Sequence, residues 1–314
     1  TTSQMLDAAT GKWSSELLSA LGIPDHFLTG IDYPGSARGR VKEDIADHLG
    51  IEQAPVFAVA THDTGSAVAA VPALNGSYAF LSSGTWSLMG VEVDRPVINE
   101  YTLKWNYTNE GCVGGRYRLL KNIMGLWIFN ECKREWDRRG EVYSYKEMDQ
   151  MAERSAPFLA FIDPDNDLFY HAGDMPEKVQ RFCQQTGQAV PQSKGEIIRC
   201  IYESLALKYR WSFEKLEEIL GYSLDVLHMV GGGIKNRMLS QFTANLIKKP
   251  VICGPVEATA IGNLMVQAMA LGEVKDQAEI RHIVKDSFPT QDYLPKDMDD
   301  WDEAYERYLK IQNQ

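Results

Sequence analysis

Positive charge is in short supply in this sequence. Its 32 Lys and Arg residues stand against 43 Asp and Glu residues, which gives a formal net charge of −11. Binding to nucleic acids or to anionic membranes depends on clustered positive charge, so this balance argues against both kinds of partner. It does not argue against a small anionic substrate held by a few local groups.

Long apolar segments and paired cysteines are also missing. No uninterrupted apolar run approaches the roughly 18 residues that a spanning helix needs, and the first six residues lack the basic and apolar regions of a signal peptide. The five cysteines are scattered, odd in number and without a CxxC pair. These features predict reduced thiols and a cytoplasmic location. The cysteines and six histidines show no metal-ligand spacing, so no protein-bound metal is predicted.

Two common nucleotide-binding motifs are absent as well. The chain has neither GxGxxG nor GxxxxGK followed by Ser or Thr, which leaves a Rossmann site or a P-loop without support. What is present is the composition of a folded protein, with 44% hydrophobic and 24% charged residues. Its 314 residues suffice for one large or two medium domains.

Helix and strand patterns alternate in the second half of the chain, which predicts an α/β fold. Apolar periodicity and end signals predict helices over 14–22, 41–49, 123–139 and 194–220. Strands are predicted over 55–60, 226–230 and 250–253, with two more between 77 and 93. Helices should follow the strands 226–230 and 250–253, ending near residues 249 and 271.

A change from helix-rich sequence to paired strands occurs at the turn signal Asn75-Gly76. We place the domain boundary there, between 1–75 and 76–314. No Pro- or Ser-rich linker marks it, so the two parts should be closely joined. The small residues of 66–73 suit a helix packed tightly against a neighbour.

The first candidate site is His62-Asp63-Thr64, which follows the strand predicted over 55–60. Loops at the carboxyl ends of strands are where open α/β sheets bind ligands. An aspartate there can accept a proton from a substrate hydroxyl, and His62 and Thr64 can hydrogen-bond to neighbouring hydroxyls. The alternative is that Asp63 only caps the helix that begins at Thr64.

Two glycine-containing turns could hold a phosphate. The stretch 83–86, Ser-Gly-Thr-Trp, joins two strands, and its hydroxyls and free amides can cradle a phosphate without a basic residue. The glycines 231–233 lie between a strand and a helix, where backbone can approach a nucleotide closely. The alternatives are an ordinary hairpin and an ordinary turn.

A dense series of polar residues runs from Asn109-Glu110-Gly111 through Arg116-Tyr117-Arg118 to 121–127. It precedes a predicted helix, and one interpretation is that these polar groups surround a bound sugar. A solvated loop leading into the amphipathic start of that helix is the simpler interpretation.

The order of these motifs resembles that of the FGGY carbohydrate kinases, over essentially the whole chain. The resemblance is carried by 61–64 (Thr-His-Asp-Thr), 82–86 (Ser-Ser-Gly-Thr-Trp), 109–111 (Asn-Glu-Gly), 120–127 (Leu-Lys-Asn-Ile-Met-Gly-Leu-Trp), 230–233 (Val-Gly-Gly-Gly) and 254–263 (Gly-Pro-Val-Glu-Ala-Thr-Ala-Ile-Gly-Asn). It implies an actin-like, ribonuclease-H-like sugar-kinase fold with two domains closing over a cleft. The implied activity is transfer of a phosphoryl group from ATP, with Mg²⁺, to a ketose.

The resemblance also implies roles for individual residues. Asp63 corresponds to the catalytic base, and His62, Asp63, Thr64 and Asn122 correspond to sugar contacts. The residues that correspond to nucleotide contacts are Thr85, Asn130, Gly232 and Gly233. Two positions depart from the family pattern: Asn130 stands where a glutamine is expected, and Cys112 stands where a glycine is usual.

Family members carry a further N-terminal stretch with its own phosphate-binding loop, which nothing here matches. The resemblance therefore implies that 1–75 is the C-terminal part of the sugar-binding domain and 76–314 the nucleotide-binding domain. Catalysis by this chain alone is not expected. We also expect exposed apolar edges in 1–75, and hence a tendency to form a homodimer or to aggregate. The remaining alternatives are a kinase of another ketose or polyol, and a non-catalytic sugar- or nucleotide-binding module.

Overall fold

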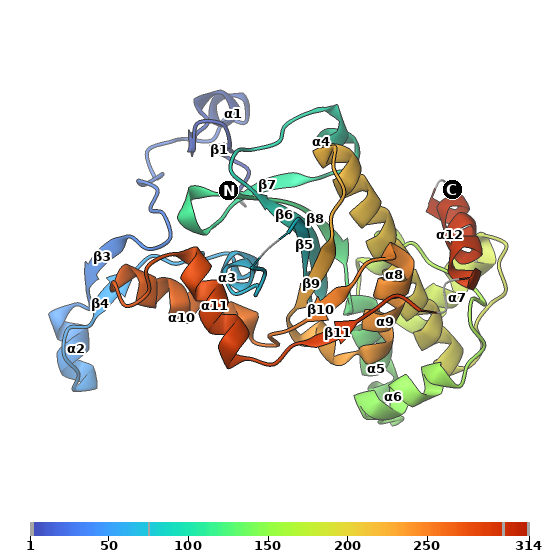
Figure 1. Ribbon diagram of the computed structural model, residues 1–314. Helices are drawn as coiled ribbons and strands as arrows, with labels where there is room; N and C mark the ends of the chain where they lie inside the picture. The colour runs from blue at the N-terminus through green and yellow to red at the C-terminus, as the bar shows by residue number, and fades with distance from the viewer. Residues whose placement is uncertain (1–2, 75, 297–298, 313–314) are drawn as a thin grey trace. The chain divides into compact units, whose positions relative to one another are not determined.

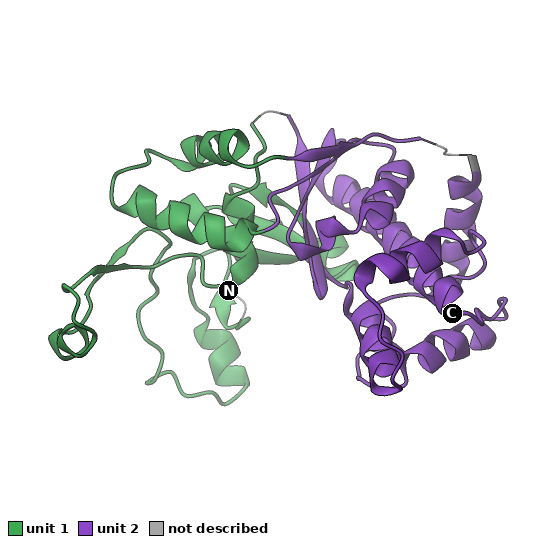
Figure 2. Ribbon diagram, turned by 90° about the horizontal axis from the view of Figure 1, so that it is seen from below, with its two compact units in different colours: residues 1–75, 90–120, 257–289 green, residues 76–89, 121–256, 290–314 purple. Residues whose placement is uncertain are grey.

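The computed structural model describes residues 3–74, 76–296 and 299–312. The chain forms two compact units (Figure 2): unit 1 comprises 1–75, 90–120 and 257–289, and unit 2 comprises 76–89, 121–256 and 290–314. The first change of unit coincides with the boundary expected near residue 75, although Asn75 itself lies outside the described residues. Unit 1 also takes in two later segments, which the sequence patterns do not indicate. The assignment of 1–75 and 76–314 to two family domains stays a prediction.

Unit 1 is built mostly from short elements. They are β1 (Leu6–Asp7), β2 (Lys12–Trp13), α1 (Ser15–Ala20), β3 (Ala37–Arg40), α2 (Glu43–Leu49), β4 (Pro55–Phe57), α3 (Asp63–Ala69), α4 (Glu100–Lys104), β7 (Thr108–Gly111), η1 (Val113–Gly115), α10 (Ala258–Ala270) and α11 (Gln277–Ser287). The helices expected over 14–22 and 41–49 are confirmed as α1 and α2. Gly50 ends α2 with a φ of 64°, a left-handed conformation that glycine adopts at little cost.

The prediction of a buried strand over 55–60 is wrong both in the length of the strand and in its burial. Strand β4 covers only Pro55–Phe57, and Pro55 and Val56 are exposed. The reason is that β4 pairs antiparallel with β3 alone, in a two-stranded sheet, and does not join the seven-stranded sheet that carries the buried strands. Other apolar side chains of unit 1 are exposed as well, among them Leu21, Phe27 and Leu49. Exposed apolar surface is therefore present as expected, while the homodimer stays a prediction.

Helices α3 and α10 pack against each other in unit 1 (Figure 1), as the small residues of 66–73 indicate. The contact is backbone against backbone, because a Cβ added at Gly262 of α10 would lie 1.8 Å from the carbonyl oxygen of Ser66 in α3. Ala60, Ala69 and Val266 are buried together beside this contact. The packing fixes α3, whose first residue is Asp63.

We therefore expect Gly262→Ala to destabilise unit 1 strongly. Overpacking a core position commonly lowers the free energy of unfolding by about 1–3 kcal/mol. We expect a loss of about 3 kcal/mol here, because the neighbouring atom belongs to the backbone and cannot rotate away. Thermal unfolding measures the loss. Gly30→Ala is the control, because a Cβ at Gly30 meets nothing within 4 Å and Tm should hardly change. Equal Tm values for the two variants would contradict the close helix contact.

Unit 2 contains longer helices and most of a sheet. Its elements are β5 (Tyr78–Ser83), α5 (Trp127–Arg138), α6 (Tyr145–Glu153), η2 (Asp167–Phe169), α7 (Met175–Gln185), α8 (Lys194–Leu220), β9 (Val226–Val230), η3 (Gly232–Lys235), α9 (Arg237–Ile247), β10 (Val251–Cys253), β11 (Gln291–Tyr293) and α12 (Asp299–Gln312). The helix expected over 194–220 is confirmed as α8, with Ser193 as its N-cap and Gly221 in the left-handed conformation at its end. The helix expected over 123–139 begins later, because Ile123 and Met124 belong to the preceding strand β8 (Tyr117–Met124).

The sheet has the strand order β11-β10-β9-β5-β6-β8-β7, and β6 covers Trp86–Val93. Strand β9 pairs in parallel with β5 and with β10, whereas β10–β11 and β7–β8 are antiparallel. In β5, the residues Ala79, Phe80 and Leu81 are fully buried, as expected for a central strand of a covered sheet. Because Ser82 pairs with Val230, the carboxyl ends of β5 and β9 meet at one edge. The two glycine-containing turns therefore leave the sheet side by side.

Candidate functional site

The Asp63 carboxylate lies at the N-terminus of α3, in unit 1. The backbone N–H of Thr64 donates to Asp63 Oδ1 at 2.7 Å, and the Thr64 hydroxyl donates to the same oxygen at 3.3 Å. Asp63 thus makes a contact like that of a helix cap, which agrees with the alternative interpretation that Asp63 caps the helix. Its side chain is nevertheless 76% exposed, and within the described part of the chain Oδ2 accepts no hydrogen bond. One carboxylate oxygen is thus held at the start of the helix, and the other makes no hydrogen bond within the described residues.

His62 joins Asp63 to a buried ion pair. His62 Nδ1 lies 2.8 Å from Glu110 Oε2, and His62 Nε2 lies 3.7 Å from Asp63 Oδ1. Arg118 Nη2 donates to the same Oε2 of Glu110 at 2.9 Å. Glu110 and Arg118 are directly opposite each other in the β7–β8 pair, and both are buried. Burial alone would raise the pKa of Glu110, but the hydrogen bond from His62 and the charge of Arg118 outweigh it, so the pKa is lowered.

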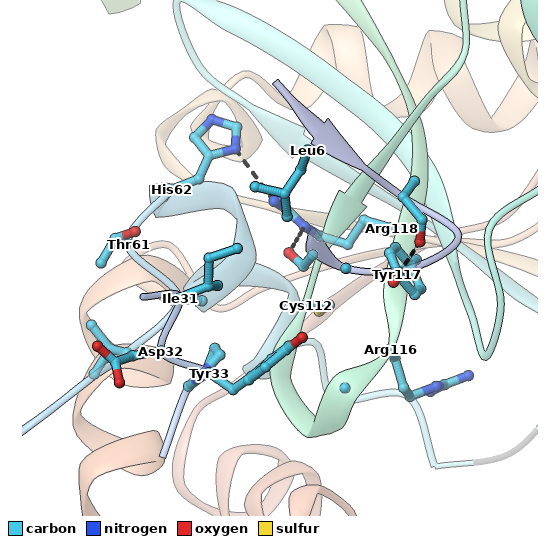
Figure 3. A pocket seen from close by; sticks show the side chains of 17 residues that line it. Leu6, Ile31, Asp32, Tyr33, Thr61, His62, Cys112, Arg116, Tyr117 and Arg118 are labelled. Atoms are coloured by element: carbon cyan, nitrogen blue, oxygen red, sulfur yellow. Dashed lines mark hydrogen bonds between the residues drawn. The ribbon is translucent and has the colours of Figure 1, made fainter. Parts of the chain in front are cut away.

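A cavity of about 170 Å³ lies beside His62 in unit 1 (Figure 3). His62 and Arg118 face each other across one side of it, and Tyr117 and Asp32 contribute further polar groups. Thr64 does not line this cavity: it is only 3% exposed, and its hydroxyl bonds to Asp63. A contact between Thr64 and a sugar therefore stays a prediction.

The two glycine-containing turns of unit 2 are packed directly on each other. A Cβ at Gly233 would lie 2.1 Å from Ser83 Oγ, and one at Gly231 would lie 2.8 Å from the Ser83 carbonyl oxygen. The N–H groups of Leu126 and Trp127, at the start of α5, donate to the carbonyl oxygens of Gly84 and Thr85. Glycine is needed at 231 and 233 because only a residue without a side chain permits this approach.

The four residues predicted to contact a nucleotide line one cavity of about 360 Å³ in unit 2. Thr85 comes from the β5–β6 turn, Asn130 from α5, and Gly232 and Gly233 from η3. The size lies in the range of small-molecule sites. The remaining lining residues are Gly84, Leu126, Phe129, Tyr145, Asp149, Tyr202, Lys235 and Asn236.

The aromatic and polar walls of this cavity are residues that the sequence reasoning missed. The Tyr202 hydroxyl donates to Asp149 Oδ1 at 2.9 Å, and Asn236 Nδ2 donates to the same oxygen at 3.4 Å. Burial raises the pKa of Asp149, against the opposing effect of the bond from Tyr202. Phe129 and Tyr145 have ring centroids 5.9 Å apart. Tyr202 belongs to the apolar stripe of α8, so its spacing signals core packing and gives no sign of a cavity.

Asn122, the other predicted sugar contact, is exposed near the end of β8 and lines neither of these two cavities. It belongs to unit 2, whereas His62, Asp63 and Thr64 belong to unit 1. Its role stays a prediction.

The described residues include no cluster of metal-ligating side chains, that is, no group of three or more His, Cys, Asp or Glu that could hold a metal ion. Mg²⁺ is usually bound through one or two carboxylates together with nucleotide phosphates and water, so a nucleotide cavity without such a cluster is compatible with MgATP. Within the described ranges, no helix is both long and apolar enough to cross a bilayer.

The glycine-lined cavity lies at the carboxyl ends of the parallel strands β5 and β9 within a mixed sheet, which is where open α/β sheets bind ligands. Residues 79–271 match the model of the C-terminal domain of the FGGY family of carbohydrate kinases. The chain therefore belongs to the FGGY family of carbohydrate kinases.

Relatives and solved structures agree with this membership. The chain is 47% identical over 304 residues to a rhamnulokinase from Bacteroides thetaiotaomicron, a match that covers 97% of the chain and 62% of that protein. It is 39% identical to a rhamnulokinase from Bacillus subtilis, covering 95% of the chain and 61% of that protein. The chain thus spans about three fifths of the length of these curated relatives.

The fold is similar to that of a xylulose kinase from Lactobacillus acidophilus, with a TM-score of 0.75 at 18% identity over 98% of this chain and 62% of the other. A glycerol kinase from Plasmodium falciparum with ADP gives a TM-score of 0.71 at 16% identity over 98% of this chain and 60% of the other. The expected α/β sugar-kinase fold is confirmed.

Proposed function

We propose that this chain carries the nucleotide site and the catalytic base of an ATP-dependent kinase that phosphorylates L-rhamnulose at its 1-hydroxyl. The convergence of Thr85, Asn130, Gly232 and Gly233 on one cavity carries the proposal, because these residues come from three separate stretches of the chain. The choice of L-rhamnulose rests on the relatives named rhamnulokinase. The five free, buried cysteines are consistent with action in the cytoplasm.

The nucleotide would lie in the unit 2 cavity with its base against the apolar and aromatic walls. Phe129, Tyr145 and Tyr202 offer flat apolar surface, while Asp149 offers a polar edge. The phosphates would lie toward Thr85 and the glycines of η3, where backbone N–H groups can donate without a side chain in the way. Lys235 adds a positive charge at the same cavity.

Asp63 would act as general base. Its exposed carboxylate takes the proton of the sugar hydroxyl as that oxygen forms a bond to the γ-phosphorus, and the bond from the γ-phosphorus to the bridging oxygen breaks. The products are the sugar phosphate and ADP. Mg²⁺, brought by the nucleotide, would neutralise charge on the phosphates.

A non-catalytic binding fragment is the second candidate. One observation favours it: the chain spans only 62% of its Bacteroides thetaiotaomicron relative. A kinase for another ketose or for a polyol uses the same chemistry, and a panel of sugars separates it from the L-rhamnulose enzyme.

Calorimetric titration with MgADP, with and without L-rhamnulose, tests the proposal. The cavity lies entirely within unit 2, so we expect weak but saturable ADP binding to the chain as it stands. Tightening of ADP binding by L-rhamnulose, and less by other ketoses and polyols, would support the sugar assignment. A folded chain that binds no ADP would contradict the nucleotide site.

A further inference from the structure

The contact between His62 and Glu110 constrains more than the position of the imidazole. Glu110 Oε2 lies 2.8 Å from His62 Nδ1 and 2.9 Å from Arg118 Nη2. An ionised carboxylate only accepts hydrogen bonds, so Nδ1 must carry a hydrogen to make this contact. Arg118 Nη2 also lies 3.3 Å from Nδ1, a longer distance than either contact to Glu110. Two donors therefore converge on one acceptor oxygen.

Burial and charge keep Glu110 in its accepting form. The Glu110 side chain is 9% exposed and that of Arg118 is 1% exposed, so water competes little with their contact. Glu110 is the one carboxylate ion-paired with Arg118 among the described residues, and Arg118 Nη1 is buried without a partner there. A neutral Glu110 would leave the buried guanidinium uncompensated, which is costly. The lowered pKa of Glu110 agrees with this reasoning.

We infer that Glu110, backed by Arg118, is a positioning residue that holds His62 as the Nδ1–H tautomer and leaves Nε2 as an acceptor for a sugar hydroxyl. Nε2 lies on the side of His62 that faces Asp63, 3.7 Å from Oδ1, and the His62 side chain is 35% exposed. A hydroxyl that donates to Nε2 would thus be bound beside the carboxylate of Asp63. Only the identity of the ligand rests on the proposed function; the tautomer rests on the geometry of unit 1.

Nuclear magnetic resonance of the histidine ring nitrogens tests the inference in the chain itself. The signals of His62 are assigned by their loss in His62→Gln. In the unmodified chain, under conditions in which the His62 ring is neutral, Nδ1 should carry the hydrogen. A neutral His62 with the hydrogen on Nε2 would overturn the inference without any variant.

Two substitutions separate positioning from simple structural support. In Glu110→Ala the acceptor is gone, and His62 should shift to the Nε2–H tautomer that free imidazole prefers. In Glu110→Gln the amide oxygen can still accept, so Nδ1–H should persist with its proton resonance moved upfield, because the acceptor is no longer charged. If Glu110→Ala does not fold, Glu110→Gln alone provides the test. An Nδ1–H resonance of His62 at the same position as in the unmodified chain would then refute the contact with the carboxylate.

Glu92→Ala is the matched control, because Glu92 is another carboxylate of unit 1, 1% exposed and ion-paired with Arg281. It should lower Tm without changing the His62 tautomer. If the His62 tautomer shifts as much in Glu92→Ala as in Glu110→Ala, the effect of Glu110 is only structural and the inference is wrong. If the tautomer is as inferred but neither ADP nor L-rhamnulose binds, the proposed function fails alone. If both bind and His62 is the Nε2–H form, the inference fails alone.

Discussion

Asp63→Asn should reduce turnover about 10³-fold while the protein remains folded. An amide cannot take the hydroxyl proton, and a positioned general base typically contributes 10²–10⁴-fold to rate. The side chain is 76% exposed, and the amide oxygen can still accept from the Thr64 N–H, so stability should hardly change. Turnover is measured with MgATP and L-rhamnulose. If the chain alone is inactive, it is joined to the part of the Bacteroides thetaiotaomicron relative that it does not match.

Asp94→Asn provides the control for this experiment. Asp94 is also in unit 1, its side chain is 87% exposed, and the substitution removes the same charge. Turnover should stay within about twofold of the unsubstituted protein, since Asp94 lines neither cavity and substitutions of exposed side chains usually have small effects. Unchanged turnover in Asp63→Asn would remove Asp63 from the mechanism and leave its contact with Thr64 as a helix cap.

The local part of the site could be predicted because it follows from short-range chemistry. Gly221 and Gly231 both have a positive φ, at the end of a helix and in a turn, where the spacing of glycines indicates a break. The strand 226–230 and the helix 194–220 correspond to β9 and α8 without change. These elements are long or sharply bounded, so their sequence patterns are decisive.

What could not be predicted depends on contacts far apart in the sequence. Nothing in Tyr78–Ser83 shows that this strand pairs with Val226–Val230, yet the pairing is what brings Thr85 to the glycines of η3. The pairing of Glu110 with Arg118 across β7–β8 likewise depends on strand register. The same reason explains the error at 55–60: an apolar pattern indicates a strand, but only the neighbouring elements decide whether it is buried.

The nucleotide cavity gives the second large effect, through Gly232→Leu. A Cβ at Gly232 meets nothing within 4 Å, and Gly232 lines the cavity, so a leucine side chain can occupy the space of a ligand without disturbing the fold. We expect affinity for MgADP to fall at least about a hundredfold, which corresponds to roughly 2.7 kcal/mol. Calorimetric titration measures the affinity, and thermal unfolding shows that the protein is intact.

Gly30→Leu is the matched control for this substitution. Gly30 has equally open surroundings but lies in unit 1 and lines neither cavity. Gly233→Ala offers a contrast, because its Cβ would collide with Ser83 and so should lower Tm as well as affinity. Suppose that Gly232→Leu loses ADP binding at a normal Tm, whereas Gly233→Ala loses both ADP binding and stability. This result would show that the cavity itself holds the nucleotide. Undiminished ADP binding in Gly232→Leu would mean that the nucleotide binds elsewhere.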